Sequence, residues 1–146
     1  MSSKIHIRTI ITDYNSHADE IRLIRKEVFL VEQAIDPADE YDDRDDACVW
    51  ALSFIGEEAV GTGRLDVEKN GRIGRVAVLT AHRRHGVGRS IMAAFEDYAS
   101  QSSELNKVWF HAQRNAVPFY LALDYSIKSE EFMEADIPHV IMEKKL

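Results

Sequence analysis

A short run of basic residues and glycines has the composition of an anion-binding site. It reads Arg83-Arg84-His85-Gly86-Val87-Gly88-Arg89, and it lies between an apolar segment that ends at Leu79 and a segment with helical spacing of apolar residues. The first N–H groups of a helix are unpaired and carry about half a positive charge. Glycines lack Cβ atoms and let a bulky anion approach the backbone, while arginine pairs well with phosphate. The run therefore predicts a diphosphate site at a strand-to-helix junction, with His85 contributing its backbone.

Two common phosphate-binding motifs do not fit this junction. A P-loop requires a glycine pair four residues apart followed by Lys and Ser or Thr, which the sequence lacks. A dinucleotide-binding fingerprint requires Gly or Ala three residues after Gly88, where Ile91 stands. It also requires an acidic residue after the next strand, which we expect to end near Ala112 without one. Another class of diphosphate ligand is therefore expected.

The charges are distributed unevenly along the chain. With 18 basic and 25 acidic residues, the formal net charge is −7, which argues against a nucleic-acid partner because such proteins need a basic face. No Asp or Glu occurs from Asn70 to Phe95, whereas the segment from Asp36 to Asp46 carries seven carboxylates and one basic residue, Arg44. We expect this acidic segment to be an exposed loop. The alternative is that Glu32, Gln33 and the run Asp42–Asp46 recognise or deprotonate a cationic amine.

The spacing of apolar residues predicts a mixed α/β fold around one central sheet. Asn70-Gly71 is typical of a hairpin turn with positive φ at both positions, and it joins the second and third strands of an antiparallel meander. Pro118 suits the first turn of a short helix. The expected strands cover residues 5–10, 49–55, 59–65, 73–79, 107–112, 125–134 and 139–144, and the expected helices cover residues 16–30, 86–101 and 118–123.

The size and composition are those of one globular domain, which we place at residues 1–146. No apolar run approaches the roughly 20 residues of a membrane span, and the N-terminus does not resemble a secretory signal. Cys48 is the only cysteine, which excludes an internal disulfide and fits a cytoplasmic location. It is expected to be a small buried residue, with an acyl-cysteine route as the alternative. The six histidines and Cys48 lack the spacing of metal ligands.

Three groups of residues resemble one known family. The stretch Arg75-Val76-Ala77-Val78 followed by Arg83-x-x-Gly86-x-Gly88 resembles motif A of the GNAT acetyltransferase superfamily. The segment from Ala116 to Tyr125, which contains Phe119-Tyr120, is similar to that superfamily's downstream Ala-x-x-Phe-Tyr-x-x-x-Gly-Phe element. The segments 28–33, 111–113 and 137–139 resemble its ElaA-like branch. Asp124 and Tyr125 replace the usual Gly-Phe, and Asp tolerates a left-handed turn better than most residues.

The resemblance implies a GNAT acyl-CoA N-acyltransferase fold, with a mixed, mostly antiparallel central sheet flanked by helices. It implies acetyl-CoA as co-substrate, no metal, and direct attack of a small-molecule or peptide amine on the thioester, which the protein assists by positioning and oxyanion stabilisation. Strand 73–79 would separate from strand 107–112 to admit the donor. Tyr120 matches the position that protonates the departing thiolate. The remaining donor-binding residues by this resemblance are Val76, Ala77, Val78, Arg83, Arg84, His85, Gly86, Val87, Gly88, Arg89 and Phe119.

Several assignments stay open on the sequence alone. The residues that could line the acceptor site are Glu32, Gln33, His111, Gln113 and His139, and both histidines have structural roles as alternatives. Tyr120 could instead be a half-buried aromatic residue of the core. The alternative to an enzyme is a non-catalytic acyl-CoA-binding module that acts through partner contacts. Edges of the C-terminal strands could support a homodimer, and no membrane partner is expected.

Overall fold

The computed structural model describes residues 5–146, and within them one sheet has eight strands. Their order is β1-β2-β3-β4-β5-β8-β6, and β7 pairs separately with β8. In this part of the chain every pairing is antiparallel except that of β4 with β5. The strands are β1 (Ile7–Thr12), β2 (Val49–Ile55), β3 (Glu58–Asp66), β4 (Arg72–Val78), β5 (Lys107–Gln113), β6 (Ser126–Ile127), β7 (Phe132–Glu134) and β8 (Ile137–Lys145). The mixed, mostly antiparallel sheet confirms the predicted fold class.

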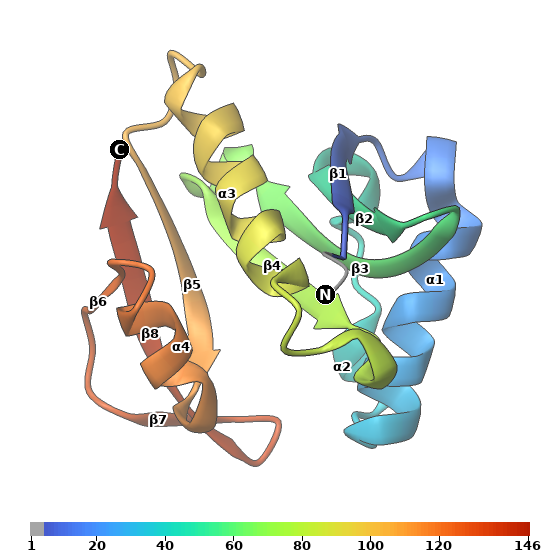
Figure 1. Ribbon diagram of the computed structural model, residues 1–146. Helices are drawn as coiled ribbons and strands as arrows, with labels where there is room; N and C mark the ends of the chain where they lie inside the picture. Colours follow the sequence, from blue (N-terminus) through green and yellow to red (C-terminus); the bar gives the residue numbers. More distant parts are fainter. Residues whose placement is uncertain (1–4) are drawn as a thin grey trace, which may run out of the picture.

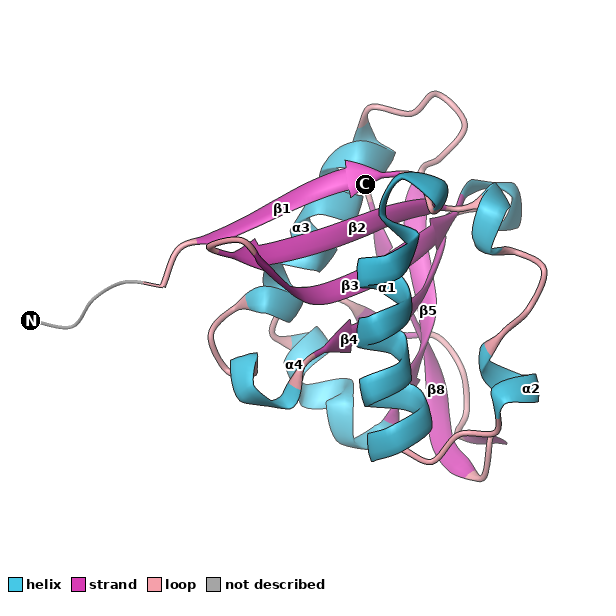
Figure 2. Cartoon of the chain, turned by 90° about the vertical axis from the view of Figure 1, so that its right-hand side faces the viewer, coloured by secondary structure: helices cyan, strands magenta, loops and turns pink. Residues whose placement is uncertain are grey.

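Helices cover both faces of this sheet (Figures 1 and 2). The helices are α1 (Ala18–Arg25), α2 (Pro37–Glu40), α3 (Val87–Ser100) and α4 (Val117–Leu121), and a π-helical segment (Lys26–Glu32) extends α1. Figure 2 shows α1 in front of the sheet and α3 behind it. Two buried clusters match these layers, one formed around α3 and the other around α1.

Close packing of α3 against β3 places the start of the helix. Gly61 and Gly63 face the helix, and a Cβ atom on Gly61 would lie 2.6 Å from Val87 Cγ1. One on Gly63 would lie 3.1 Å from a ring carbon of Phe95. Neither position has room for a side chain, because packed interiors leave few voids of that size. The two glycines therefore let the first turns of α3 approach the sheet.

The structure corrects two details of the predicted elements. Asn70 and Gly71 have positive φ angles of 60° and 87° as predicted, but a 3₁₀ turn at residues 67–69 lengthens the connection beyond a two-residue hairpin. The strand expected at 125–134 is interrupted between β6 and β7. There the hydroxyl of Ser129 accepts the N–H of Ile141 at 2.8 Å, so a side chain replaces a ladder bond. Asp124 has φ 71°, which confirms the left-handed turn expected there.

No helix among residues 5–146 combines the length and the apolar character needed to cross a membrane.

Candidate active site

Strands β4 and β5 separate soon after they meet. These parallel neighbours share a single bridge pair, Arg72 with Trp109, whereas β5 pairs with β8 along its whole length. Figure 1 shows β4 and β5 diverging from one end. Parallel strands normally continue an evenly spaced ladder. The divergence confirms the predicted opening, and it creates a V with Arg72 near its vertex.

A bulge in β4 lies along one arm of this V. Thr62 pairs with Ala77 and Arg64 pairs with Gly74, so Arg75 and Val76 together oppose one residue of β3. A bulge of this kind leaves the extra residue out of the ladder and re-aims the backbone. Arg75 has φ 54°, which is rare for a residue with a side chain. The bulge therefore interrupts the ladder at Val76, one of the residues expected to bind the donor.

Contacts of the Arg75 side chain with the acidic segment hold this bulge in place. Its Nε donates to the backbone carbonyl of Glu40 at 3.1 Å, and Nη2 donates to that of Asp39 at 3.3 Å. The carboxylates of Glu40 and Asp42 lie 3.1 and 3.4 Å from the guanidinium. A left-handed residue costs about 1–2 kcal/mol, so these contacts stabilise a conformation that arginine rarely adopts.

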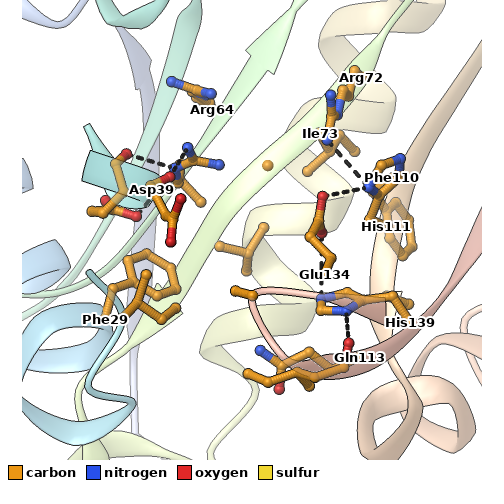
Figure 3. A pocket seen from close by; sticks show the side chains of 18 of the residues that line it. Phe29, Asp39, Arg64, Arg72, Ile73, Phe110, His111, Gln113, Glu134 and His139 are labelled. Atoms are coloured by element: carbon orange, nitrogen blue, oxygen red, sulfur yellow. Dashed lines mark hydrogen bonds and ion pairs between the residues drawn. The ribbon is translucent and has the colours of Figure 1, made fainter. Parts of the chain in front are cut away.

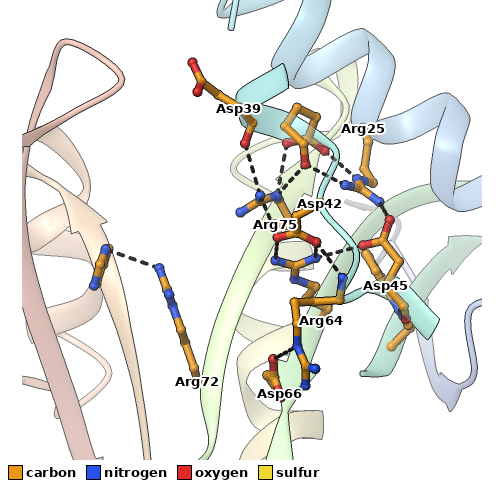
Figure 4. A network of polar contacts seen from close by, with 12 residues as sticks. Arg25, Asp39, Asp42, Asp45, Arg64, Asp66, Arg72 and Arg75 are labelled. Atoms are coloured by element: carbon orange, nitrogen blue, oxygen red, sulfur yellow. Dashed lines mark hydrogen bonds and ion pairs between the residues drawn. The ribbon is translucent and has the colours of Figure 1, made fainter. Parts of the chain in front are cut away.

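The acidic segment that supplies these carboxylates is mostly exposed, as predicted, but it is not only a solvated loop, because some of its carboxylates form buried ion pairs. Glu40 is 3% exposed and pairs with Arg25, which is fully buried. Asp42 and Asp45 both bind the guanidinium of Arg64 (Figure 4). Hydrogen bonds from Arg64 hold the pKa of Asp42 far below its usual range, whereas burial raises the pKa of Glu40. The sequence gives no sign of these ion pairs, because the arginine partners come from elements that are distant along the chain.

We expect Arg75→Met to lower kcat by roughly ten- to a hundredfold, because a shift of about 1 Å in a positioning group can cost that much. Arg75→Gly should retain more activity, since glycine adopts positive φ without support from the acidic segment. Steady-state kinetics and calorimetric titration with acetyl-CoA would separate kcat from donor affinity, which should change little. Equal kcat values for the two variants would contradict a role for Arg75 in holding the bulge.

The predicted anion-binding run lies where β4 leads into α3. Gly86 precedes the first residue of α3 and has φ 92°, which favours glycine. Its neighbour Arg84 has φ 65°, and Arg84, His85 and Arg89 are exposed. Within the described residues neither Arg84 nor Arg89 pairs with a carboxylate. Exposed helix N–H groups and two uncommitted arginines suit a diphosphate.

The other residues of the run have different positions. Val87 is buried in the core, and Gly88 faces Phe119, whose Cζ would lie 3.5 Å from a Cβ atom at Gly88. Arg83 donates from Nε to the carbonyl of Val78 at 2.9 Å, and both of its Nη groups donate to Glu32. Hydrogen bonds from Arg83 lower the pKa of Glu32. The side chain of Glu32 therefore lies at this junction and does not line the cavity that holds the other predicted acceptor residues.

A cavity of about 510 Å³ occupies the opening between β4 and β5 (Figure 3). It is bounded by the end of the α1 extension on one side and by the β7–β8 hairpin on the other. Gln33, His111, Gln113 and His139 line it, as does Val76 of the bulge. Gln113 lies within hydrogen-bonding distance of Gln33, at 3.4 Å. The structure thus brings four of the five predicted acceptor residues together.

Tyr120 also borders this cavity. It packs against Phe110 and Phe119, with ring centroids 4.4 and 5.0 Å away. Burial raises the pKa of Tyr120 to about 12, which keeps the phenol protonated. Among residues 5–146 its hydroxyl has no hydrogen-bond partner, so its proton is available to a substrate.

Two histidines and one carboxylate form a cluster on the cavity wall. Glu134 Oε1 lies 3.0 Å from His111 Nδ1, and its Oε2 lies 3.5 Å from His139 Nε2. The Nδ1 of His139 lies 2.7 Å from the carbonyl of Ile137. Sequence reasoning missed Glu134. No sequence signal marks it, because the turn after it places Ala135 and Asp136 at positive φ and alanine rarely adopts that conformation.

Cys48 lies outside this cavity and is 5% exposed. Burial raises its pKa to about 11, so the thiol stays protonated and is a poor nucleophile. Both observations disfavour the acyl-cysteine route.

Comparison with known proteins agrees with this geometry. The family described as Acetyltransferase (GNAT) domain matches residues 18–146. The uncharacterized N-acetyltransferase YjcF of Bacillus subtilis is 34% identical over 140 residues, which cover 94% of this chain and 99% of YjcF. A Lactobacillus plantarum protein assigned as an N-acetyltransferase superposes with a TM-score of 0.87 at 28% identity, covering 96% of this chain and 98% of its own. Escherichia coli ElaA superposes with a TM-score of 0.82 at 26% identity, covering 94% and 99%. The chain belongs to the GNAT family of acetyltransferases and is an N-acetyltransferase.

Proposed function

We propose that the protein transfers the acetyl group of acetyl-CoA directly to the amine of a small molecule or peptide, and that residues 1–146 act as one domain. The observation that carries the proposal is the opening between β4 and β5. The Gly86 junction lies beyond one arm, the bulge lies along it, and Tyr120 borders the cavity in between. In this proposal acetyl-CoA, the N–H groups that stabilise the oxyanion and the phenol that donates a proton all lie around this opening.

The junction fits the diphosphate of coenzyme A. Arg84 and Arg89 are the arginines there without carboxylate partners in the described chain. The backbone at Gly86 is unobstructed, since among residues 5–146 outside its own helix turn the nearest atom to a Cβ placed on it is Ile7 Cδ1 at 3.9 Å. Phe119 lies beside Gly88 and offers an exposed apolar ring, 45% accessible, to the donor. Arg83 contributes by tying the junction to Glu32 and Val78. Backbone groups from Val76 to Val78 are the proposed partners of the pantetheine arm.

The residues around the cavity account for each proton and bond of the reaction. Acetyl-CoA supplies a thioester whose carbonyl carbon is attacked by the neutral amine, so that a C–N bond forms and the C–S bond breaks. N–H groups at the bulge near Val76 stabilise the negative charge on the carbonyl oxygen. Tyr120 gives its proton to the departing thiolate, and the proton lost by the amine replaces it through solvent or a cavity side chain.

Donor binding can be tested with two glycines of the same backbone conformation. Gly86→Val should weaken coenzyme A binding by about tenfold or more, since a Cβ atom would crowd the helix start where the anion approaches. Gly56→Val is the matched control, because Gly56 also has positive φ, 61°, but lies in the β2–β3 turn with open space around it. Calorimetric titration and thermal unfolding would be measured for both variants. Equal losses of affinity would show that strain, and not the junction, is responsible.

The non-catalytic alternative makes a different prediction. A binding module would bind acetyl-CoA as described but release no free thiol with any amine. An enzyme releases coenzyme A in proportion to the acetylated amine.

Two further expectations stay predictions. The reduced, buried Cys48 is compatible with a cytoplasmic location. A homodimer would use the edge near β6 and β7, where Ile127 and Met133 are 47% and 63% exposed.

A further inference from the structure

Most of the arginines and several of the carboxylates that line the cavity neutralise each other or are paired with residues outside it. Arg64 and Arg75 are paired with carboxylates of the acidic segment. Asp66 receives two hydrogen bonds from Arg44. Among the described residues of the lining, the basic side chains without a carboxylate within 4 Å are Lys69 and Arg72.

Arg72 is held in position although it lacks a counterion. Its guanidinium carbon lies 5.4 Å from the ring centroid of Trp109, and Trp109 donates to the carbonyl of Lys69 at 3.0 Å. Nη2 of Arg72 lies 3.3 Å from His111 Nδ1. The side chain is half-buried at the vertex where β4 and β5 meet. A preorganised arginine fork binds carboxylate or phosphate oxygens well.

His111 cannot satisfy Arg72 and Glu134 together. Its Nδ1 lies 3.3 Å from Arg72 and 3.0 Å from Glu134. A guanidinium only donates and a carboxylate only accepts, so this nitrogen can accept from Arg72 or donate to Glu134, but not both. When it donates to Glu134, the guanidinium faces an N–H group and lacks an acceptor there. An oxyanion of a bound substrate would supply one.

Glu134 offers the opposite charge nearby. Its ionic partners in the described chain are two imidazoles, which carry a charge only when protonated. Its carboxylate is 44% exposed and points into the cavity in Figure 3. Because Arg72 and Glu134 approach the same imidazole nitrogen, the two charges are only a few ångströms apart.

We propose that the acceptor is a small amine that also carries a carboxylate or phosphate group, whose oxyanion binds Arg72 and Lys69 and whose amino group lies beside Glu134. The proposal rests on the acetyltransferase function above and names the class of acceptor. The short separation of the two charged groups favours amino acids and short phosphorylated amines over long polyamines. The carboxylate and the phosphate share the same oxyanion chemistry, and the experiment distinguishes them.

The test compares matched acceptors with and without the anion. Amino acids would be paired with their amides, and O-phosphoethanolamine with ethanolamine, in assays of free thiol release at saturating acetyl-CoA. The wild-type protein should prefer the anionic member of at least one pair by about tenfold or more in kcat/KM, as expected for a charge-assisted contact. The pair that shows the preference identifies carboxylate or phosphate.

In Arg72→Gln, the ratio of kcat/KM for the anionic member to that for the neutral member should fall toward one. Turnover of the neutral member should be retained. Lys128→Gln is the control, because Lys128 is exposed, outside the cavity and without an ion pair in the described chain. The proposal would be overturned if the neutral member of each pair were turned over as well as the anionic member. It would also be overturned if the preference for the anionic member survived in Arg72→Gln. In both cases the acetyltransferase function would stand.

Absence of turnover with every amine would count against the proposed function itself. A binding titration then decides the acceptor class. O-phosphoethanolamine and glycine would be titrated into protein saturated with coenzyme A, so that the donor junction is occupied. Binding that is lost in Arg72→Gln supports the acceptor class, and absent binding, or binding unchanged in that variant, overturns it.

Discussion

Tyr120→Phe is expected to lower kcat by about a hundredfold or more while leaving the affinity for acetyl-CoA unchanged. Loss of a general acid typically costs 10² to 10⁴ in rate. The substitution removes only a hydroxyl that has no partner among residues 5–146, so packing against Phe110 and Phe119 is retained. Steady-state thiol release and calorimetric binding of acetyl-CoA would be measured on the same preparation.

The control is Tyr98→Phe, since Tyr98 is an exposed tyrosine of α3 outside the cavity. Because burial raises the pKa of Tyr120 to about 12, its neutral form persists well above the ordinary tyrosine value of about 10. The wild-type rate should therefore show no alkaline loss from Tyr120 near pH 10. A wild-type kcat in Tyr120→Phe would remove this residue from the chemistry.

Arg25→Met is expected to lower the free energy of unfolding by about 3–5 kcal/mol, because a buried carboxylate loses the closer of its two arginine partners and keeps only Arg75. Arg25 is fully buried, and it donates to both the side chain and the backbone carbonyl of Glu40. It also donates to Asp45 at 2.9 Å. Urea unfolding followed by circular dichroism would measure the loss.

The loss of stability in Arg25→Met should become smaller as the pH is lowered. Burial already raises the pKa of Glu40, and removing Arg25 raises it further. A carboxyl with a raised folded-state pKa contributes most below its unfolded value and loses that contribution as the pH rises through the folded value. Arg25→Met should therefore approach the wild-type stability under acidic conditions.

Two variants complete the stability experiment. Arg25→Met with Glu40→Gln should recover part of the loss, since the buried carboxylate that loses Arg25 is then replaced by a neutral amide. Arg114→Met, which breaks the exposed pair with Glu131, should leave the urea midpoint close to the wild-type value. A similar loss in Arg114→Met and Arg25→Met would contradict a special role for the buried network.

Local patterns in the sequence predict most of the fold. The meander of β2, β3 and β4 follows from apolar strands joined by turn residues, and the start of α3 follows from Gly86 and the apolar spacing after it. The separation of β4 from β5 could be predicted only from the resemblance to the GNAT family, because no local pattern encodes a parallel pair that diverges. The exposure of the acidic segment was predicted, but its ion pairs with Arg25 and Arg64 were not, since such pairing depends on tertiary structure.

The site shows the same division between local and long-range information. The run from Arg83 to Arg89 is contiguous, so it can be recognised in the sequence as an anion-binding site. The sequence does not show that its first arginine is paired with Glu32. The left-handed conformation of Arg75 could not be read from the sequence, because arginine does not favour it and its support comes from residues over thirty positions away. Glu134 reaches the cavity only when the β7–β8 hairpin pairs as it does.

Direct acetyl transfer is tested most sharply in a single turnover. Protein saturated with acetyl-CoA would be mixed with an acceptor amine, and mass spectrometry would follow the amine, the free coenzyme A and the intact protein together. Acetylated amine and coenzyme A should appear in equal amounts while the mass of the protein stays unchanged. An acetylated protein that forms before the product, or bound acetyl-CoA that remains intact with every amine, would contradict the mechanism.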